Sequence, residues 1–288
     1  MKLLISVATF KRPAMLRRLL MSLFSGGIGH NEVDVVVVDN DPQRSAAGTA
    51  GLFTSVTYVY EPQPGIPAAR NRALDEFKAD YFAMVFVDDD EWVSPGWLDA
   101  LLAAQEETQA GVVYGLVKTE GGDDRAAAIQ RTERPHLSKL KTAAANNTLL
   151  TYAAWTQAGQ PRFDPAFAAL GGEDSDFFFG LHQAGTKIVS TSEAVVFEDL
   201  PLERASFIWF AKRYLRQGQA NYLLARKYQL NRVKWTLRTL AEIPACAVML
   251  LGDVLRRRGK SSPWLRRGLF ALGKLSALGG IRIRGYRS

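Results

Sequence analysis

The sequence offers little chemistry that depends on sulfur or imidazole. It contains one cysteine, Cys246, and three histidines, His30, His136 and His182, none of them spaced as metal ligands. A lone cysteine excludes a disulfide framework within the chain, and scattered histidines do not make a structural zinc site. We therefore expect a protein of a reducing compartment.

Long hydrophobic runs are also missing. The longest uncharged apolar run covers ten residues, 243–252, whereas a membrane-spanning helix needs about 20. At the N-terminus a short apolar run soon reaches Lys11, Arg12 and Pro13, which is too short for the core of a signal peptide. We interpret this run as the first strand, and the run at 243–252 as an interfacial or core segment.

Acidic residues become scarce after residue 200. Residues 1–200 hold 17 Lys or Arg and 26 Asp or Glu, a net charge of −9, while residues 201–288 hold 19 and 3, a net charge of +16. Such an asymmetry indicates two functional parts. We predict a catalytic domain at 1–200 and a basic helical extension at 201–288.

Strand and helix patterns alternate through the first domain. Apolar, β-branched runs occupy residues 3–8, 33–38, 56–61 and 81–87. Between the first two, Met15, Leu19 and Leu23 have the spacing of one helix face, and a second helix is expected near 66–78. Continuous apolar strands that alternate with helices predict an α/β fold with a mostly parallel, Rossmann-like sheet covered by helices on both faces.

Polar side chains follow several of these strands. Thr9 ends the first run, Asp39 ends the second, and Asp88, Asp89 and Asp90 end the fourth. Ligands of open α/β sheets bind outside the carboxyl ends of the strands. We therefore expect these side chains to converge on one site.

Three adjacent carboxylates repel one another unless a cation offsets their charge. Mg²⁺ and Mn²⁺ bind oxygen ligands, and one or two carboxylates commonly hold them together with water and substrate phosphates. The alternative is a solvated acidic loop. The position directly behind a buried strand favours the metal site.

Six motifs, in the same order, resemble the inverting glycosyltransferases of family 2, which have the GT-A fold. They are "SVATFKRPAMLRRLLMSL" near the start, "VVVVDNDP" at the second strand, "QPGIPAARNRAL", "FVDDDEW", "FDPAFAALGGEDSDFF", and the segment that begins "EDLPLERASF" and ends "RYLRQG". The resemblance covers roughly the first 220 residues. The later motifs are most similar to the bacterial exopolysaccharide and lipopolysaccharide branch, of the succinoglycan glucosyltransferase type.

The resemblance implies residues that bind the nucleotide. Asp39 would accept a hydrogen bond from the base, unless it is a turn or cap residue. Arg70 and Asn71 match nucleotide contacts, although a solvated helix face would also place an arginine there. The remaining donor contacts implied by the family motifs are Thr9, Phe10, Arg12, Asp88, Asp89 and Glu173.

The same resemblance implies the chemistry. Asp90 would ligate Mn²⁺ or Mg²⁺, which neutralises the charge that develops on the departing nucleoside diphosphate. Asp174 would be the catalytic base that takes the proton of the acceptor hydroxyl. A helix start capped by Asp174 or Ser175 is the structural alternative.

Some positions depart from the family pattern. Lys11 stands where an asparagine is usual, and the preceding aromatic is Phe10, so the base stacks on a ring without a hydroxyl. Phe179 and Gly180 replace a basic residue, which puts the phosphate contact of that loop in doubt. A P-loop and the glycine-rich signature of sugar-nucleotide pyrophosphorylases are absent, which argues against nucleotidyl transfer.

The basic extension has an amphipathic pattern at 205–229, with aromatic residues beside Lys and Arg. Together with the run at 243–252, this pattern predicts a tail that lies on an anionic membrane surface. A solvated, packed helical subdomain is the alternative. Nucleic acid is not an expected partner, because no recognition motif accompanies the charge.

The sequence as a whole predicts an inverting, metal-dependent glycosyltransferase of bacterial surface polysaccharide synthesis. A nucleoside diphosphate sugar is the expected donor, with a UDP-sugar favoured, and a lipid-linked saccharide or polysaccharide is the expected acceptor. The expected location is cytoplasmic, peripheral at the inner face of the plasma membrane. The alternative is a catalytically silent GT-A module that binds a nucleotide or scaffolds an assembly.

Overall fold

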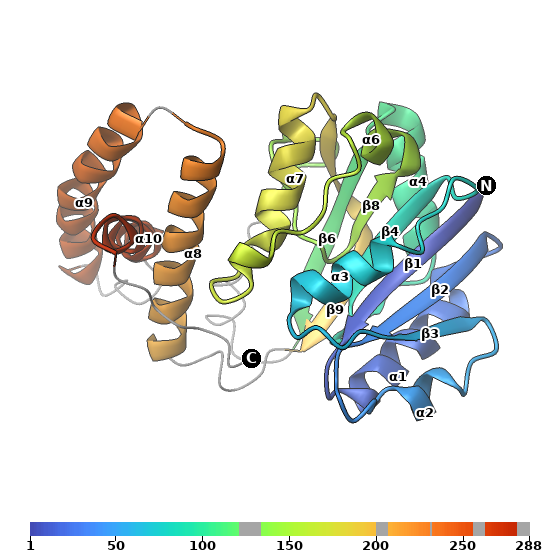
Figure 1. The fold of residues 1–288 in the computed structure, drawn as a ribbon. Coiled ribbons are helices and arrows are strands. Elements are labelled where there is room, and N and C mark those ends of the chain that lie inside the picture. The colour runs from blue at the N-terminus through green and yellow to red at the C-terminus, as the bar shows by residue number, and fades with distance from the viewer. Residues whose placement is uncertain (121–133, 200–206, 231, 256–262, 281–288) are drawn as a thin grey trace. The chain divides into compact units, whose positions relative to one another are not determined.

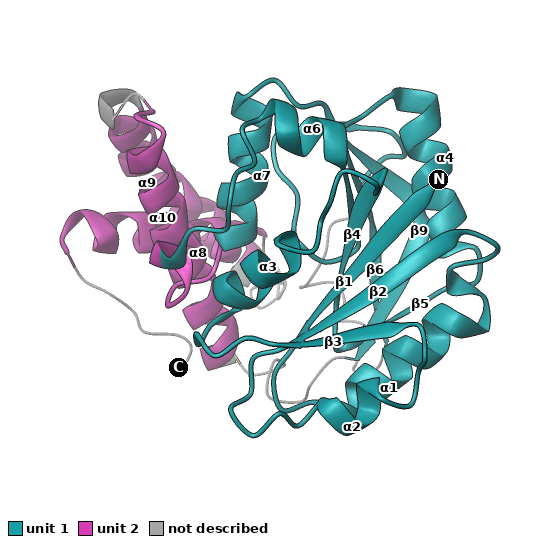
Figure 2. Ribbon diagram, turned by 45° about the vertical axis from the view of Figure 1, so that its right-hand side comes forward, with its two compact units in different colours: residues 1–120, 131–165, 173–199 teal, residues 121–130, 166–172, 200–288 magenta. Residues whose placement is uncertain are grey.

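The structure is a computed structural model that describes residues 1–120, 134–199, 207–230, 232–255 and 263–280. The chain forms two compact units (Figure 2). The sheet unit contains residues 1–120, 131–165 and 173–199, and the helical unit contains residues 121–130, 166–172 and 200–288.

A mixed sheet forms the centre of the sheet unit. Its strands are β1 (Lys2–Thr9), β2 (Glu32–Asp39), β3 (Val56–Tyr60), β4 (Ala83–Asp88), β5 (Glu91–Val93), β6 (Val112–Glu120), β7 (Lys139–Leu140), β8 (Thr148–Thr151) and β9 (Ile188–Asp199). Their order is β3-β2-β1-β4-β8-β6-β9-β5, and β7 pairs with β9. Most paired residues lie in parallel ladders, which join β3, β2, β1 and β4 and join β6 to β9. The ladders made by β8, β5 and β7 are antiparallel.

Helices cover both faces of this sheet (Figure 1). On one face lie α1 (Pro13–Ser22), which a short π-helical turn extends over Leu23–Gly27, and α4 (Trp97–Thr108). On the other face lie α3 (Ile66–Leu74), α6 (Tyr152–Gln157) and α7 (Glu173–Gln183). The short helix α2 (Ala47–Ala50) and a 3-10 turn (Pro165–Phe167) complete the elements described before residue 200.

The strands feed both cores because successive side chains point to opposite faces of a sheet. In β4, Val85 and Val87 join the α1 and α4 layer, while Met84 and Phe86 join the α3 and α7 layer. This is why the strand reads as an unbroken apolar run. The polar residues begin only at Asp88, where β4 leaves the sheet.

The basic extension folds as a packed unit of three long helices, α8 (Phe207–Lys227), α9 (Arg232–Leu255) and α10 (Pro263–Leu278). Two glycines let α8 and α10 approach closely: a Cβ on Gly218 would overlap the carbonyl oxygen of Phe270, and a Cβ on Gly273 that of Leu215. Cys246 of α9 is buried. The helices α8 and α9 therefore both pack against α10, and the membrane association predicted for this extension stays a prediction.

No helix among the described residues is both long and apolar enough to cross a membrane. The sequence stretch predicted as one helix or a helix pair at 205–229 is the single helix α8. The start of that stretch, at 205–206, lies outside the described residues.

Candidate active site

The carboxyl ends of β1 and β4 lie side by side, because Ala8 pairs with Asp88 in a parallel ladder. The first contact between the two strand ends is a hydrogen bond from the Thr9 hydroxyl to Asp89 Oδ2, 2.8 Å long. Both residues are buried. The convergence expected for the ends of these two strands is therefore present.

Two arginines offset the charge of the acidic turn at 88–90. Arg12, just before α1, places one Nη1 atom 3.0 Å from Asp89 Oδ1 and 2.9 Å from Asp90 Oδ2. Arg70 of α3 reaches Asp88 Oδ1 at 3.1 Å and Glu173 Oε1 at 2.7 Å. Arg70 and Glu173 have side chains only 8% and 9% exposed, so this pair is shielded from water.

Three carboxylates meet two arginines at the turn, and Arg70 is shared with Glu173, so negative charge remains in excess. Partial burial raises the pKa of Asp88, and the charges of Asp90 and Asp89 add to this shift, whereas the attraction of Arg70 opposes it; the side chain of Asp88 stays 35% exposed. Burial also raises the pKa of Asp89, against the attraction of Arg12. A further cation at this turn would stabilise the charged carboxylates.

A fourth carboxylate, Glu91, supports the turn from inside, and sequence reasoning missed it. Glu91 is 1% exposed; its Oε2 accepts the backbone N–H of Asp88 at 3.1 Å and its Oε1 accepts the Asn146 amide at 2.9 Å. Asn146 directly precedes Asn147, whose amide bonds the backbone of Leu116. The only sequence signal was an acidic residue at the first position of a strand that otherwise reads as apolar.

The acidic motif at 173–176 opens α7, and its first two residues differ in exposure. Glu173 is buried against Arg70, and burial raises the pKa of its carboxyl group. Asp174 is half-buried, and its Oδ1 accepts the N–H of Ser175 at 2.6 Å. The charge of Asp174 also acts on Arg70 and Glu173. Asp174 is thus a helix-start residue beside the buried ion pair, and its role as a base stays a prediction.

Asp39 lies at the end of β2 but is turned into the protein. It is fully buried, and it accepts the N–H of Asp41 at 3.0 Å, the N–H of Ala46 at 2.8 Å and the Tyr58 hydroxyl at 3.1 Å. This is the geometry of the turn-residue alternative. The contact between Asp39 and the base stays a prediction. It would require the carboxylate to give up or share one of these three hydrogen bonds.

Asn71 also has its polar atoms occupied. Its side-chain amide donates to the Phe163 carbonyl at 2.9 Å and accepts the Phe163 N–H at 2.8 Å, as a paired backbone would. Asn71 thereby fixes the segment before the 3-10 turn to α3. A nucleotide contact from Asn71 would require this pair to open, so the observed geometry favours a structural role.

Phe10 is the exposed aromatic of the site. It directly follows Thr9, its side chain is 49% exposed, and the Lys11 ammonium lies 5.1 Å from its ring centre. A free ring beside the buried strand end suits stacking on a flat base.

The described residues contain no ready-made cluster of three or more His, Cys, Asp or Glu that could hold a metal. The residues fit a divalent ion in another way. Asp90 supplies carboxylate oxygen on a side chain that is 21% exposed, and the three carboxylates of the turn share two arginines with Glu173. Hard cations held by one or two carboxylates and substrate phosphates use such a site.

The fold belongs to a class that contains solved glycosyltransferases of GT-A fold. A mannosyltransferase from Pyrobaculum calidifontis, solved with GDP-Man and Mn²⁺, superposes with a TM-score of 0.67 at 14% identity, over 96% of this chain and 86% of that one. Staphylococcus aureus TarS 1–349 gives 0.56 at 16% identity, over 99% and 93%. At these identities the likeness concerns the fold.

The particular family follows from the sequence itself. The profile of Glycosyl transferase family 2 matches residues 5–163, more than half of the chain, so the chain belongs to this family and is a glycosyltransferase. The succinoglycan biosynthesis protein ExoM of Rhizobium meliloti (strain 1021) is 37% identical over 81% of this chain and 78% of its own. ExoW of the same organism is 32% identical over 39% and 36%.

Proposed function

We propose that the protein transfers a sugar, with inversion and with the help of a divalent metal ion, from a nucleoside diphosphate sugar to a growing surface polysaccharide. One observation carries this proposal. The acidic turn at 88–90 follows β4 beside the carboxyl end of β1, and its three carboxylates pair with only two arginines, one of which, Arg70, is shared with Glu173.

Asp90 is the residue that would hold Mn²⁺ or Mg²⁺. Asp89 is buried against Thr9 and Arg12, and Asp88 pairs with the buried Arg70, whereas Asp90 pairs with the exposed Arg12 and is itself 21% exposed. When bound, the ion neutralises the charge that develops on the leaving diphosphate. Arg12 holds Asp89 and Asp90 in place. Arg70 holds Asp88 Oδ1, and the exposed part of the Asp88 carboxylate would contact the ribose.

The donor is a nucleotide sugar, and a UDP-sugar is favoured. Two solved relatives by fold support this kind of donor: the TarS 1–349 structure contains UDP-GlcNAc and the Pyrobaculum enzyme contains GDP-Man. In our proposal the base stacks on Phe10, and Thr9 and Asp39 line the same strand ends. The half-exposed ring of Phe10 supports the stacking.

Asp174 is proposed as the general base. Inverting transfer needs a carboxylate on the side opposite the leaving group to accept the proton of the acceptor hydroxyl. Asp174 is half-buried and opens α7 beside the buried pair of Arg70 and Glu173. Glu173 then positions the loop through Arg70 and does not meet the acceptor.

The acceptor is proposed to be a lipid-linked saccharide or polysaccharide, met at the inner face of the bacterial plasma membrane. The similarity to a succinoglycan biosynthesis protein supports a polysaccharide acceptor. The net charge of +16 after residue 200 supports an anionic surface as the place where the two meet.

Release of nucleoside diphosphate from a panel of nucleotide sugars, with and without Mn²⁺, tests the proposal. We expect the wild-type protein to release diphosphate from one donor in a metal-dependent way. Asp90→Asn should lose both this release and the metal-dependent binding of the donor. Asp80→Asn is the matched control, since Asp80 is an exposed carboxylate before the opposite end of β4. A wild-type protein that binds donor but releases no diphosphate would instead be a silent module.

A further inference from the structure

One surface of the helical unit is apolar although water reaches it. Seven exposed, uncharged residues share one side of α9: Leu237, Leu240, Ala241, Pro244, Ala247, Val248 and Leu251. The other exposed residues in the described part of α9 are Arg238, Ala245 and Met249, which lie beside this side. Leu237, Val248 and Leu251 are 62%, 69% and 60% exposed. We call these seven residues the apolar face of α9.

Helical geometry puts the seven residues on one side. At about 100° per residue they fall within an arc of roughly 120° and extend for about 20 Å along the axis. Buried Thr239 and Cys246 point the other way, into the helical unit, where α9 packs beside α10 (Figure 1). A helix at the surface of a water-soluble protein normally has charged residues on its outward side. This arrangement therefore calls for a partner.

The charge of the helical unit selects that partner. Its residues 201–288 carry 19 Lys or Arg and only 3 Asp or Glu. Arg238 lies beside the apolar face, and its side chain is 80% exposed although it pairs with Glu242 at 3.2 Å. Arg226 and Lys227 at the end of α8 are exposed as well. Two copies of so basic a unit would repel each other, whereas an anionic lipid surface attracts it.

We propose that the apolar face of α9 enters the interfacial layer of a membrane that contains anionic lipids, with the helix axis parallel to the membrane plane. The face is shorter than the roughly 30 Å of hydrocarbon that a spanning helix must cross, so it lies in the surface. The inference rests on the membrane location in the proposed function and names the side chains that make the contact. It is independent of the chemistry at the acidic turn.

Binding of the full-length chain to vesicles tests the contact. The variant Leu240→Glu/Val248→Glu puts two charges on the apolar face, at residues that are 50% and 69% exposed. The control Leu52→Glu adds a charge at a leucine of the sheet unit that is 65% exposed. We expect wild-type and control proteins to sediment with phosphatidylcholine vesicles containing phosphatidylglycerol, and the double variant to bind at least about tenfold more weakly.

Two further measurements separate the membrane contact from the chemistry at the acidic turn. Raised salt should weaken wild-type binding, because screening acts on the exposed cations. Metal-dependent release of diphosphate from the donor, measured without vesicles, should be the same in all three proteins. Loss of that release in the wild type would count against the proposed function, whereas equal vesicle binding by the double variant and the wild type would overturn the membrane contact.

A local reporter identifies the face directly. Cys246 is buried and is the only cysteine of the chain. A polarity-sensitive dye can therefore be attached at Val248→Cys, or at Leu52→Cys as the control, in a Cys246→Ala background. We expect a blue shift only for the dye at position 248 and only with anionic vesicles. A blue shift without vesicles that grows with protein concentration would show that a second copy covers the face and would overturn the proposal.

Discussion

Removal of Arg70 should destabilise the sheet unit more than removal of any exposed arginine. Arg70 lies between Asp88 and Glu173, and its side chain is 8% exposed. In Arg70→Met the aliphatic stem is kept, but Glu173 is left buried without its cation. Breaking a buried pair from one side costs about 3–5 kcal/mol. Asp88 adds less, because it is 35% exposed.

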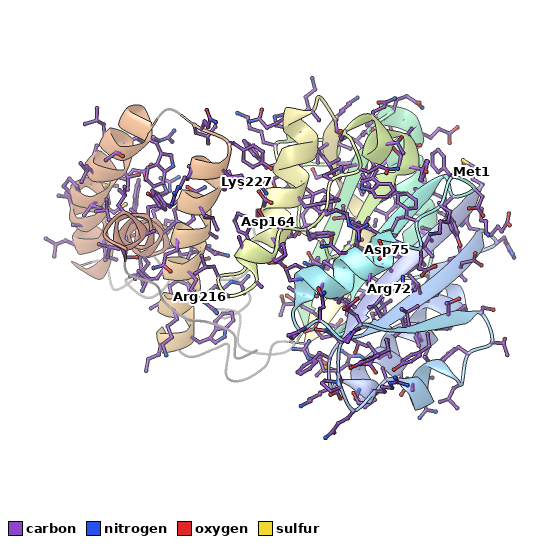
Figure 3. All side chains as sticks on the ribbon, viewed as in Figure 1. Met1, Arg72, Asp75, Asp164, Arg216 and Lys227 are labelled. Carbon is purple, nitrogen blue, oxygen red and sulfur yellow. The ribbon has the colours of Figure 1, made fainter. Side chains whose placement is uncertain are left out.

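Arg72→Met is the matched control on the same helix. Arg72, labelled in Figure 3, pairs with Glu76 four residues later, at side chains 30% and 33% exposed. Such a pair contributes below about 1 kcal/mol. Urea unfolding followed by tryptophan fluorescence measures both variants. If Arg70→Met cost no more than Arg72→Met, the buried pair would not have the importance that we assign to it.

The stability cost of Arg70→Met should also depend on pH, and the burial of Glu173 determines whether this cost rises or falls with pH. Burial raises the pKa of Glu173 while Arg70 lowers it, so loss of Arg70 raises that pKa further. A group with a raised pKa in the folded state destabilises the fold as the pH rises, because the unfolded chain ionises first. The cost of Arg70→Met should be small near about pH 4 and grow toward about pH 8. Adding Glu173→Gln should recover part of the loss and remove most of this dependence.

Two further predictions concern packing and support. Glu91→Ala should cost about 1–3 kcal/mol of stability and weaken metal-dependent donor binding, since the Asp88 N–H loses its acceptor. Glu91→Gln keeps one acceptor oxygen and should bind the donor nearly as the wild type does. Equal donor binding by the two variants would contradict the supporting role of Glu91. Gly273→Ala should lower the thermal unfolding temperature, because the added Cβ overlaps the Leu215 carbonyl oxygen. Gly268→Ala is the control and should be neutral or stabilising, because the added Cβ would lie 3.6 Å from its nearest neighbour, the Cβ of Cys246.

The sequence predicted the part of the fold whose elements are local and apolar. The strands expected at 3–8, 33–38 and 81–87 are β1, β2 and β4, and the expected helices are α1 and α3. Each reads as an uninterrupted apolar run or as one clear helix face. The extended strand β9 was not predicted, because Ser190, Thr191 and Glu193 interrupt its apolar pattern.

The site was predictable in its residues more than in their contacts. The pattern placed Thr9 and Asp89 at strand ends that were expected to converge on one site, and the two side chains are hydrogen-bonded. It did not reveal that Asp39 is occupied by Tyr58, or Asn71 by Phe163, because those partners lie far away in the sequence. Whether a polar side chain is free to bind a ligand therefore depends on partners that the local sequence does not show.

The charge pattern predicted two parts of the chain with a division at residue 200. The structure has a sheet unit that ends at Asp199, but it also groups residues 166–172 with the helical unit. No local signal sets that segment apart, because its composition, "AFAALGG", is that of an ordinary loop. Phe167 of this segment is buried, and the Lys227 ammonium lies 5.7 Å from its ring centre.

The separation of donor binding from sugar transfer in Asp174→Asn tests the central claim most directly. Asparagine keeps the size of Asp174 and its ability to accept the Ser175 N–H, but it cannot take a proton from the acceptor. We predict unchanged Mn²⁺-dependent affinity for the donor and a fall in transfer of about 10²–10⁴, the usual contribution of a general base. Glu173→Gln and Asp176→Asn should each reduce transfer less. Loss of donor binding in Asp174→Asn, or a larger loss of transfer in Glu173→Gln, would contradict the account.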